Sequence, residues 1–141
     1  MIAREIRIEA RPETVFAFIT DPALIVRWMG TEAELDPRPG GVCRVVVNPR
    51  SVVRGEFVEV VPHSRVVFTW GFEEPGATVA PGSSTVEVTL TPDGAGTLLR
   101  LEHRDLPEPS RAQHDMGWEH FLDRLRVVAA GDDPGPDPWA T

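Results

Sequence analysis

Residues 110–130, SRAQHDMGWEHFLDRLRVVAA, form the longest helical pattern in the chain. Ser110 and Gln113 have the spacing of a capping box, in which both side chains satisfy backbone donors at a helix start. We therefore expect the helix to begin at Ser110 and to stop at Gly131, because glycine adopts the backbone conformation that ends a helix. About 20 helical residues reach about 30 Å, which spans a small domain. The apolar residues of this helix recur at helical spacing: Met116, Trp118, Phe121, Leu122, Leu125 and Val128.

The chain before this helix begins with a strand and two short helices. From Ile2 to Glu9, one face of the pattern is mostly isoleucine and the other is mostly charged, as in a strand with one buried face. Pro12 suits the first position of a helix, and Asp21 is suited to cap a second helix that begins at Pro22. We expect both helices to cover one end of the sheet.

The stretch from Thr31 to Asp105 repeats short strand patterns separated by Pro, Gly, Asn and Ser, which is typical of an antiparallel sheet. The sequence therefore predicts one α+β domain over residues 1–130, in which a curved antiparallel sheet of about seven strands is closed by the final helix. The longest loop between strands, Glu73 to Ser83, is a candidate pocket lid. Residues 131–141 are rich in Asp, Pro and Gly, and we expect them to form a disordered tail. The strands after the short helices are expected near Glu32 to Asp36, Gly41 to Asn48, Val52 to Val61, Arg65 to Phe72, Ser84 to Thr91 and Gly96 to Arg104.

The composition argues against several classes of function. The 141 residues carry a formal charge of −8, and all 14 basic residues are arginines, so a nucleic-acid partner is not expected. Although 41% of the residues are hydrophobic, no apolar run approaches the length of a membrane-spanning helix, and we expect no membrane insertion. The N-terminus lacks a signal-peptide pattern, which predicts a cytoplasmic protein. The lone Cys43 offers neither an internal disulfide nor a zinc framework.

Several segments, taken in order, resemble one protein family. They are Ala10-Arg11-Pro12-Glu13-Thr14-Val15-Phe16, Asp21-Pro22 through Arg27-Trp28-Met29, Gly55-Glu56-Phe57-Val58-Glu59-Val60, Val67-Phe68-Thr69-Trp70 and Gly117-Trp118 through Phe121-Leu122. From Ile2 to about Ala130, the chain resembles the AHSA1-type (activator of Hsp90 ATPase homologue 1-like) branch of the START/Bet v 1-like superfamily (SRPBCC), in particular its stand-alone bacterial members. The resemblance implies a helix-grip fold, in which the sheet wraps around the last helix and leaves a hydrophobic cavity between them. A fold resemblance alone does not supply a substrate.

The residues expected to line this cavity are mostly aromatic and aliphatic. Trp28, Trp70 and Trp118 fall on the second helix, a strand and the long helix, which are the elements that should surround the cavity. Strand alternation also turns Cys43 inward, but a buried thiol without a basic neighbour is inert. Small-ligand pockets are mainly apolar with a few orienting polar groups, although the same rings would also suit a filled core. The predicted ligand-binding residues are Trp28, Met29, Val45, Val47, Phe57, Phe68, Trp70, His103, His114, Trp118, Phe121 and Leu122.

Two histidines are the best polar candidates for the pocket. His103 shares strand parity with Leu99 and Leu101, which aims it into the cavity, and His114 lies one helical turn before Trp118. For each of them we favour a structural histidine whose nitrogens are satisfied by hydrogen bonds.

Other titratable residues give weaker signals. Glu59 shares a strand face with Phe57, so it points inward with Phe57 unless a β-bulge intervenes, and we favour a solvated glutamate. His114 and His120 are six positions apart on one helix, so they cannot share a metal ion as residues four apart can. We predict no metal site, no cofactor and no assembled catalytic set.

The leading functional hypothesis is binding or carriage of a small hydrophobic or amphipathic molecule in the cavity. One alternative is a cyclase- or dehydratase-like enzyme acting on a polyketide-type substrate, with His103, Glu59 and His114 as acid or base. Another is an Hsp90-cochaperone-like module that binds a protein partner. The lack of a Ser-His-Asp, Cys-His or phosphate-loop motif favours binding over catalysis. Homodimer formation is left open, because nothing in the sequence marks a subunit surface.

Overall fold

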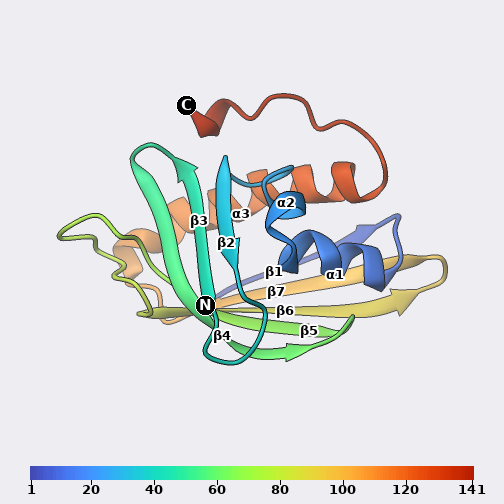
Figure 1. Cartoon of the computed structure of the whole chain (residues 1–141), viewed down its shortest axis with the longest axis horizontal. Helices are drawn as coiled ribbons and strands as arrows, with labels where there is room; N and C mark the ends of the chain where they lie inside the picture. Colours follow the sequence, from blue (N-terminus) through green and yellow to red (C-terminus); the bar gives the residue numbers. More distant parts are fainter.

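The computed structural model describes all 141 residues and contains one seven-stranded antiparallel sheet. The strands lie in the order β1-β7-β6-β5-β4-β3-β2, so β1 and β2 form the two edges (Figure 1). This arrangement confirms the predicted α+β helix-grip fold. In chain order, the elements are β1 (Ile2–Ile8), α1 (Pro12–Thr20), α2 (Pro22–Ile25), β2 (Glu32–Leu35), β3 (Val42–Asn48), β4 (Ser51–Val61), β5 (Arg65–Trp70), β6 (Ser84–Asp93), β7 (Gly96–Arg104), α3 (Glu108–Ala129) and the 3₁₀-helix η1 (Pro138–Ala140).

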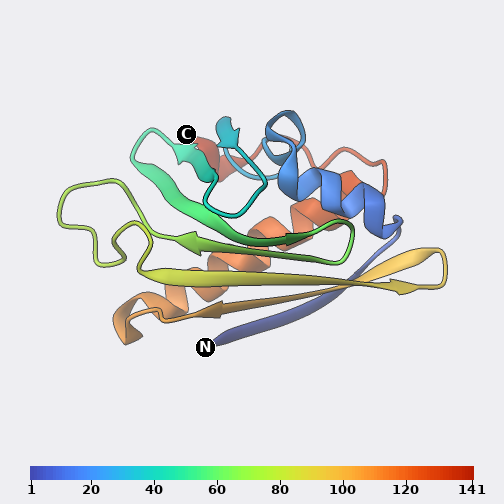
Figure 2. The same cartoon turned by 60° about the horizontal axis from the view of Figure 1, so that its bottom comes forward.

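The sheet curves around α3, which crosses its concave face, and α1 and α2 cover one end (Figure 1, Figure 2). Alternate residues of each strand point toward the helix, as the two-residue period requires. Phe68 and Trp70 on β5 and Trp118 and Leu125 on α3 are all buried in the resulting core. No helix of the structure has the length and apolar character needed to span a bilayer.

A β-bulge on β4 decides the orientation of Glu59. The pairing of β4 with β5 shifts register between Phe57 and Glu59, so these two residues no longer share a face. Phe57 is buried in the core, whereas the Glu59 carboxylate lies outside and pairs with Arg65 at 3.2 Å. The interpretation of Glu59 as a surface residue is therefore confirmed.

The predicted capping box is wrong, because α3 begins two residues before Ser110. Pro107 is the N-cap residue and makes no side-chain hydrogen bond, while Pro109 lies in the first turn. Prolines are favoured there because first-turn N–H groups have no helical partner and the ring already holds a helical φ. Ser110 is instead a buried residue inside the helix.

The start of α2 and the end of α3 follow the sequence prediction, but α2 ends at Ile25, so Trp28 lies in the turn after this helix and not on it. The Asp21 carboxylate caps α2 by accepting a hydrogen bond from the Ala23 amide at 2.8 Å. Gly131 has a φ of +96° just beyond α3. The amides of Gly131 and Asp132 donate to the carbonyls of Val128 and Val127, each at 3.1 Å, which is the Schellman pattern of a glycine-terminated helix.

The segment after α3 differs from the expected disordered tail. Residues 132–141 turn back over α3 and end in η1 beside the β3–β4 hairpin (Figure 1). The side chain of Asp137 is only 8% exposed, and the ring of Trp139 stacks on His120. Low apolar content predicted disorder, but a few specific contacts with α3 place this segment.

The burial pattern of α3 predicts the cost of truncating its side chains. Leu125 is completely buried and Met116 is 63% exposed on the same helix. We expect Leu125→Ala to lower the free energy of unfolding by about 2–5 kcal/mol, because it leaves a core cavity. Met116→Ala should change it by less than about 0.5 kcal/mol. Urea denaturation of both variants measures the difference, and equal effects would contradict the placement of α3 in the core.

Candidate functional site

The space between the centre of the sheet and α3 is almost filled. The inner cavity has a volume of about 30 Å³, which suits no more than a water molecule. All 16 of its lining residues are hydrophobic. Eight of the predicted ligand-binding residues meet here, and they pack against one another as core: Trp28, Met29, Val45, Phe57, Phe68, Trp70, Trp118 and Leu122.

A larger pocket opens at the end of the core, between the β3–β4 hairpin, the loop after β5, the first half of α3 and η1. This outer pocket has a volume of about 300 Å³, and half of its 16 lining residues are hydrophobic. Five predicted residues contribute to it, namely Val47, Trp70, His114, Trp118 and Phe121. The other lining residues are Asn48, Ser51, Phe72, Glu74, Ala77, Thr78, Val79, Ser110, Gln113, Gly117 and Trp139.

A still larger depression lies on the other side of α3, between the β1 edge and the tail, with a volume of about 860 Å³. Only three of its 14 lining residues are hydrophobic. Its charges are partly paired with each other, as in the contact between Arg4 Nε and Asp115 Oδ1 at 2.9 Å. The smaller outer pocket is the better candidate site, because it combines aromatic walls with a few polar groups.

His103 is completely buried behind the outer pocket and has both ring nitrogens engaged. Its Nδ1 accepts a hydrogen bond from Trp118 Nε1 at 3.0 Å. The hydroxyl of Ser84 donates to the Trp70 carbonyl, so His103 Nε2 donates to Ser84 Oγ at 2.9 Å. Burial, with a contribution from the nearby His114, lowers the pKa of His103 from 6.5 to about 3. The ring is therefore neutral, and its tautomer is fixed by its partners.

His114 is held in the same way at the wall of the outer pocket. Its Nδ1 donates to the carbonyl of Ser110 at 2.8 Å, because a carbonyl can only accept. Its Nε2 accepts a hydrogen bond from Trp70 Nε1 at 3.2 Å. Burial lowers the pKa of His114 as well. Two indole N–H groups and two neutral imidazoles thus satisfy one another, and the structural interpretation favoured from the sequence describes both histidines.

The outer pocket has polar groups but no arginine in its lining. Asn48, Ser51, Thr78 and Gln113 supply amide and hydroxyl groups, and Glu74 is the one acidic residue in the lining. Neither Arg44, whose Nε pairs with Glu73 Oε2 at 2.8 Å, nor Arg50, which lies between Asn48 and Ser51 in the β3–β4 turn, is among the lining residues. The lining itself therefore offers no arginine to an anionic ligand.

Cys43 lines the inner cavity and does not reach the outer pocket. Burial raises the pKa of its thiol to about 12, so the group stays protonated at neutral pH. A thiol that does not ionise is a poor nucleophile, in line with the inert role expected from the sequence.

The loop Glu73 to Ser83, expected from the sequence as a pocket lid, contributes Glu74, Ala77, Thr78 and Val79 to the outer pocket, but Phe72 and Trp139 were not predicted as site residues. Phe72 follows β5, and Trp139 lies in the segment expected to be disordered. Gly117 carried a usable signal, because glycine inside a helix costs about 1 kcal/mol relative to alanine and usually has a packing or functional reason. A Cβ at this position would have only Trp139 Cζ3 within 4 Å, at 3.9 Å, so the glycine keeps space open in the pocket.

The sequence model of the family described as "Activator of Hsp90 ATPase homolog 1-like protein" matches residues 9–130. The chain belongs to this AHSA1-like family. The human protein named "Activator of 90 kDa heat shock protein ATPase homolog 1" is 27% identical over 111 residues, which are 78% of this chain. The chain spans only 31% of the length of that human relative.

Two solved structures share the fold. The solution structure of the AHSA1-like protein of Rhizobium etli is 50% identical and has a TM-score of 0.77, over 99% of this chain and 88% of that one. The crystal structure of CalU16 from Micromonospora echinospora is 32% identical and has a TM-score of 0.76, over 96% of this chain and 76% of that one.

The lowered histidine pKa values predict a loss of stability in mild acid. Below pH 6.5 the unfolded chain binds a proton at His103, whereas the folded chain binds it only near the folded pKa of about 3. The free energy of unfolding should therefore fall with decreasing pH, by about 1.4 kcal/mol per pH unit from this ring. His114 adds to the effect in the same direction.

Urea denaturation between pH 6.5 and about pH 5 measures this slope, in a range where exposed carboxylates remain ionised. His103→Gln keeps a donor and an acceptor at this position but cannot titrate. The free energy of unfolding of this variant should therefore change less steeply with pH than that of the native protein, by about 1.4 kcal/mol per pH unit. Identical slopes for the two proteins would show that His103 is not the neutral buried group described above.

Proposed function

We propose that this AHSA1-like protein binds a small, uncharged, largely aromatic molecule in the outer pocket. The observation that carries the proposal is a 300 Å³ pocket with aromatic walls and neutral polar groups. This volume lies at the lower end of the range for small-molecule sites, about 300–1,000 Å³. The expected ligand site thus moves from the centre of the helix grip to its open end, because the inner cavity of 30 Å³ is too small.

The aromatic rings of the outer pocket support a planar ligand. Trp70 and Phe72 meet edge to face, with ring centroids 6.0 Å apart. Phe121 and Trp139 meet in the same way at 5.7 Å from the helix side. Such rings contribute contact area and favour stacked or edge-on aromatic partners. Asn48, located at the end of β3, and Gln113 can orient polar substituents of the ligand.

The charges of the pocket favour an uncharged ligand over a fatty acid or another carboxylate. Burying an ionised carboxylate without a partner is costly, and the lining contains Glu74 but no arginine. His114 does not compensate, because burial lowers its pKa and keeps the ring neutral at pH 7. The proposed ligand is therefore amphipathic through hydroxyl, carbonyl or amide groups.

The enzymatic alternative has less support from the geometry. His103 and His114 already use both ring nitrogens, and their partners are held inside the core. Glu59 lies on the outer face of β4 and pairs with Arg65. A general acid or base must reach the proton that it transfers, and none of these three groups is free to do so here. Noncovalent binding or carriage in the cytoplasm remains our proposal.

The protein-binding alternative rests on the name of the human relative, of which this chain spans less than a third. On the outer face of the sheet, Glu87 is bound by Arg65 and Arg104 at 2.9 and 3.0 Å. Ion pairs of this kind leave no large apolar patch for a partner on that part of the face. A homodimer or an Hsp90-type partner remains the alternative proposal if the ligand experiments below detect no binding.

Two ligands that share one ring system test the proposal. We expect 2-naphthol to bind the protein and 2-naphthoate to bind at least about tenfold more weakly, because only the latter brings a carboxylate into the pocket. Isothermal titration gives the two affinities, and chemical-shift changes of the tryptophan indole N–H signals locate the site. Stronger binding of the carboxylate would contradict the charge argument.

Gly117 provides a matched pair of variants for the same experiment. Gly117→Leu places a side chain in the outer pocket and should reduce 2-naphthol affinity about tenfold or more, while helix propensity favours its folding. Gly117→Ala adds one methyl group, with room for it beside Trp139, and should retain most of the affinity. Unchanged binding by a folded Gly117→Leu protein would place the ligand elsewhere.

A further inference from the structure

The tail forms part of the candidate site. Trp139, in η1, lines the outer pocket together with residues of β3, the loop after β5 and α3. We propose that residues 132–141 form a strap that supplies Trp139 as one wall of the ligand site, and that ligand and strap stabilise each other in place. This inference rests on the proposed function, since it assigns an additional binding residue and a coupled segment to the same pocket.

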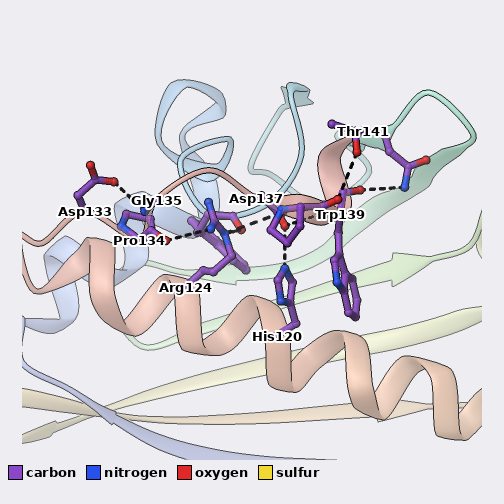
Figure 3. A network of polar contacts seen from close by, with 11 residues as sticks. His120, Arg124, Asp133, Pro134, Gly135, Asp137, Trp139 and Thr141 are labelled. Atoms are coloured by element: carbon purple, nitrogen blue, oxygen red, sulfur yellow. Dashed lines mark hydrogen bonds and ion pairs between the residues drawn. The ribbon is translucent and has the colours of Figure 1, made fainter.

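One carboxylate oxygen organises the end of the strap (Figure 3). Asp137 Oδ1 accepts a hydrogen bond from His120 Nε2 at 2.8 Å and another from the Trp139 amide at 2.9 Å. The second bond closes the turn that begins η1 and sets the direction of the Trp139 side chain. Asp137 therefore links α3 to the pocket wall.

The Trp139 ring is positioned by aromatic contacts with α3. It stacks on the His120 ring, with centroids 4.1 Å apart and planes inclined by 10°. The absence of a side chain at Gly117 lets the indole lie close to the helix, within van der Waals distance of where a Cβ would be. The far side of the strap is held by Asn48 Nδ2, which donates to the Trp139 carbonyl at 3.2 Å.

The remainder of the strap is held by one arginine. Arg124 Nη1 donates to the Pro134 carbonyl at 3.3 Å (Figure 3). Its Nε donates to the Trp28 carbonyl at 3.2 Å. The contact from Arg124 Nε to Asp137 Oδ2 is 3.9 Å, too long for a hydrogen bond, and this buried oxygen has no partner. The strap thus depends on few contacts for its position.

A segment held by so few contacts is sensitive to anything that adds to them. A ligand that touches both Trp139 and the fixed walls binds the closed strap better than the open one, and so increases the closed population. Coupling between two equilibria is reciprocal, so a strap that is released must weaken ligand binding by the same factor. We therefore expect any change that opens the strap, at Asp137 or at Trp139, to weaken ligand binding, and we expect bound ligand to hold the strap closed.

The test uses the full chain, with Asp137→Ala to release the strap and Asp137→Asn to retain an acceptor oxygen. Hydrogen exchange followed by NMR reports the Trp139 amide without any ligand. We expect this amide to be protected in the native protein, exposed in Asp137→Ala and intermediate in Asp137→Asn. For 2-naphthol, the Kd of Asp137→Ala should rise about fivefold or more, and 2-naphthol should slow the exchange of the native Trp139 amide.

Trp139→Ala removes the wall itself and should weaken 2-naphthol binding at least as much as Asp137→Ala. Met116→Ala, an exposed change on α3, should leave both exchange and affinity unchanged. An unprotected Trp139 amide in the native protein would overturn the strap without any reference to a ligand. If Asp137→Ala and Trp139→Ala bind 2-naphthol as tightly as the native chain, the strap is not part of the site, although the proposed function stands.

Two further outcomes are informative. Tighter binding in Asp137→Ala would mean that the strap blocks the pocket, which contradicts the proposed wall. A protected Trp139 amide with no 2-naphthol binding in any protein would remove the proposed function and with it the ligand role of Trp139, leaving the strap as a structural contact only.

Discussion

The structure depends on the burial of one face of α3 against a curved sheet. Trp118, Leu122 and Leu125 fill the centre of the grip and leave only a small inner cavity. Burying Trp118 and Trp70 also removes two indole N–H donors from water, and each unpaired donor would be costly. His103 and His114 accept these two hydrogen bonds, so the polar residues that resemble a site are required by the packing itself.

The same packing explains where the candidate site lies. Large side chains fill the grip beneath α1 and α2, and space remains only where the β3–β4 hairpin diverges from the first half of α3. At that end the helix carries Gly117, which has no side chain to fill the gap. The pocket is completed by Trp139, which is far away in the sequence. The positions of large and small side chains along α3 therefore explain both the filled core and the open pocket at its end.

Sequence patterns predicted the strands, the Asp21 cap and the end of α3 at Gly131, because each depends on local geometry. The sequence also indicated the outward orientation of Glu59 as one of two possibilities. Strand alternation required either an inward glutamate or a β-bulge between Phe57 and Glu59, and the structure has the bulge. The helix start was mispredicted because two prolines compete with the capping box. Local patterns could not show whether the inner cavity was filled, because that depends on the fit of side chains from many elements. The contacts of the tail were equally hidden, as Asp137 and His120 are 17 positions apart.

The hydrogen bonds between indole and imidazole have a consequence for divergence within the family. Trp70 Nε1 needs the lone pair of His114, and Trp118 Nε1 needs that of His103. A relative that replaces one of these histidines with an apolar residue would leave a buried indole N–H without an acceptor, unless the tryptophan is replaced as well. The two Trp–His pairs should therefore change together within the family. Where the tryptophan is present, its partner should be a hydrogen-bond acceptor, and where phenylalanine replaces the tryptophan, the partner can be apolar.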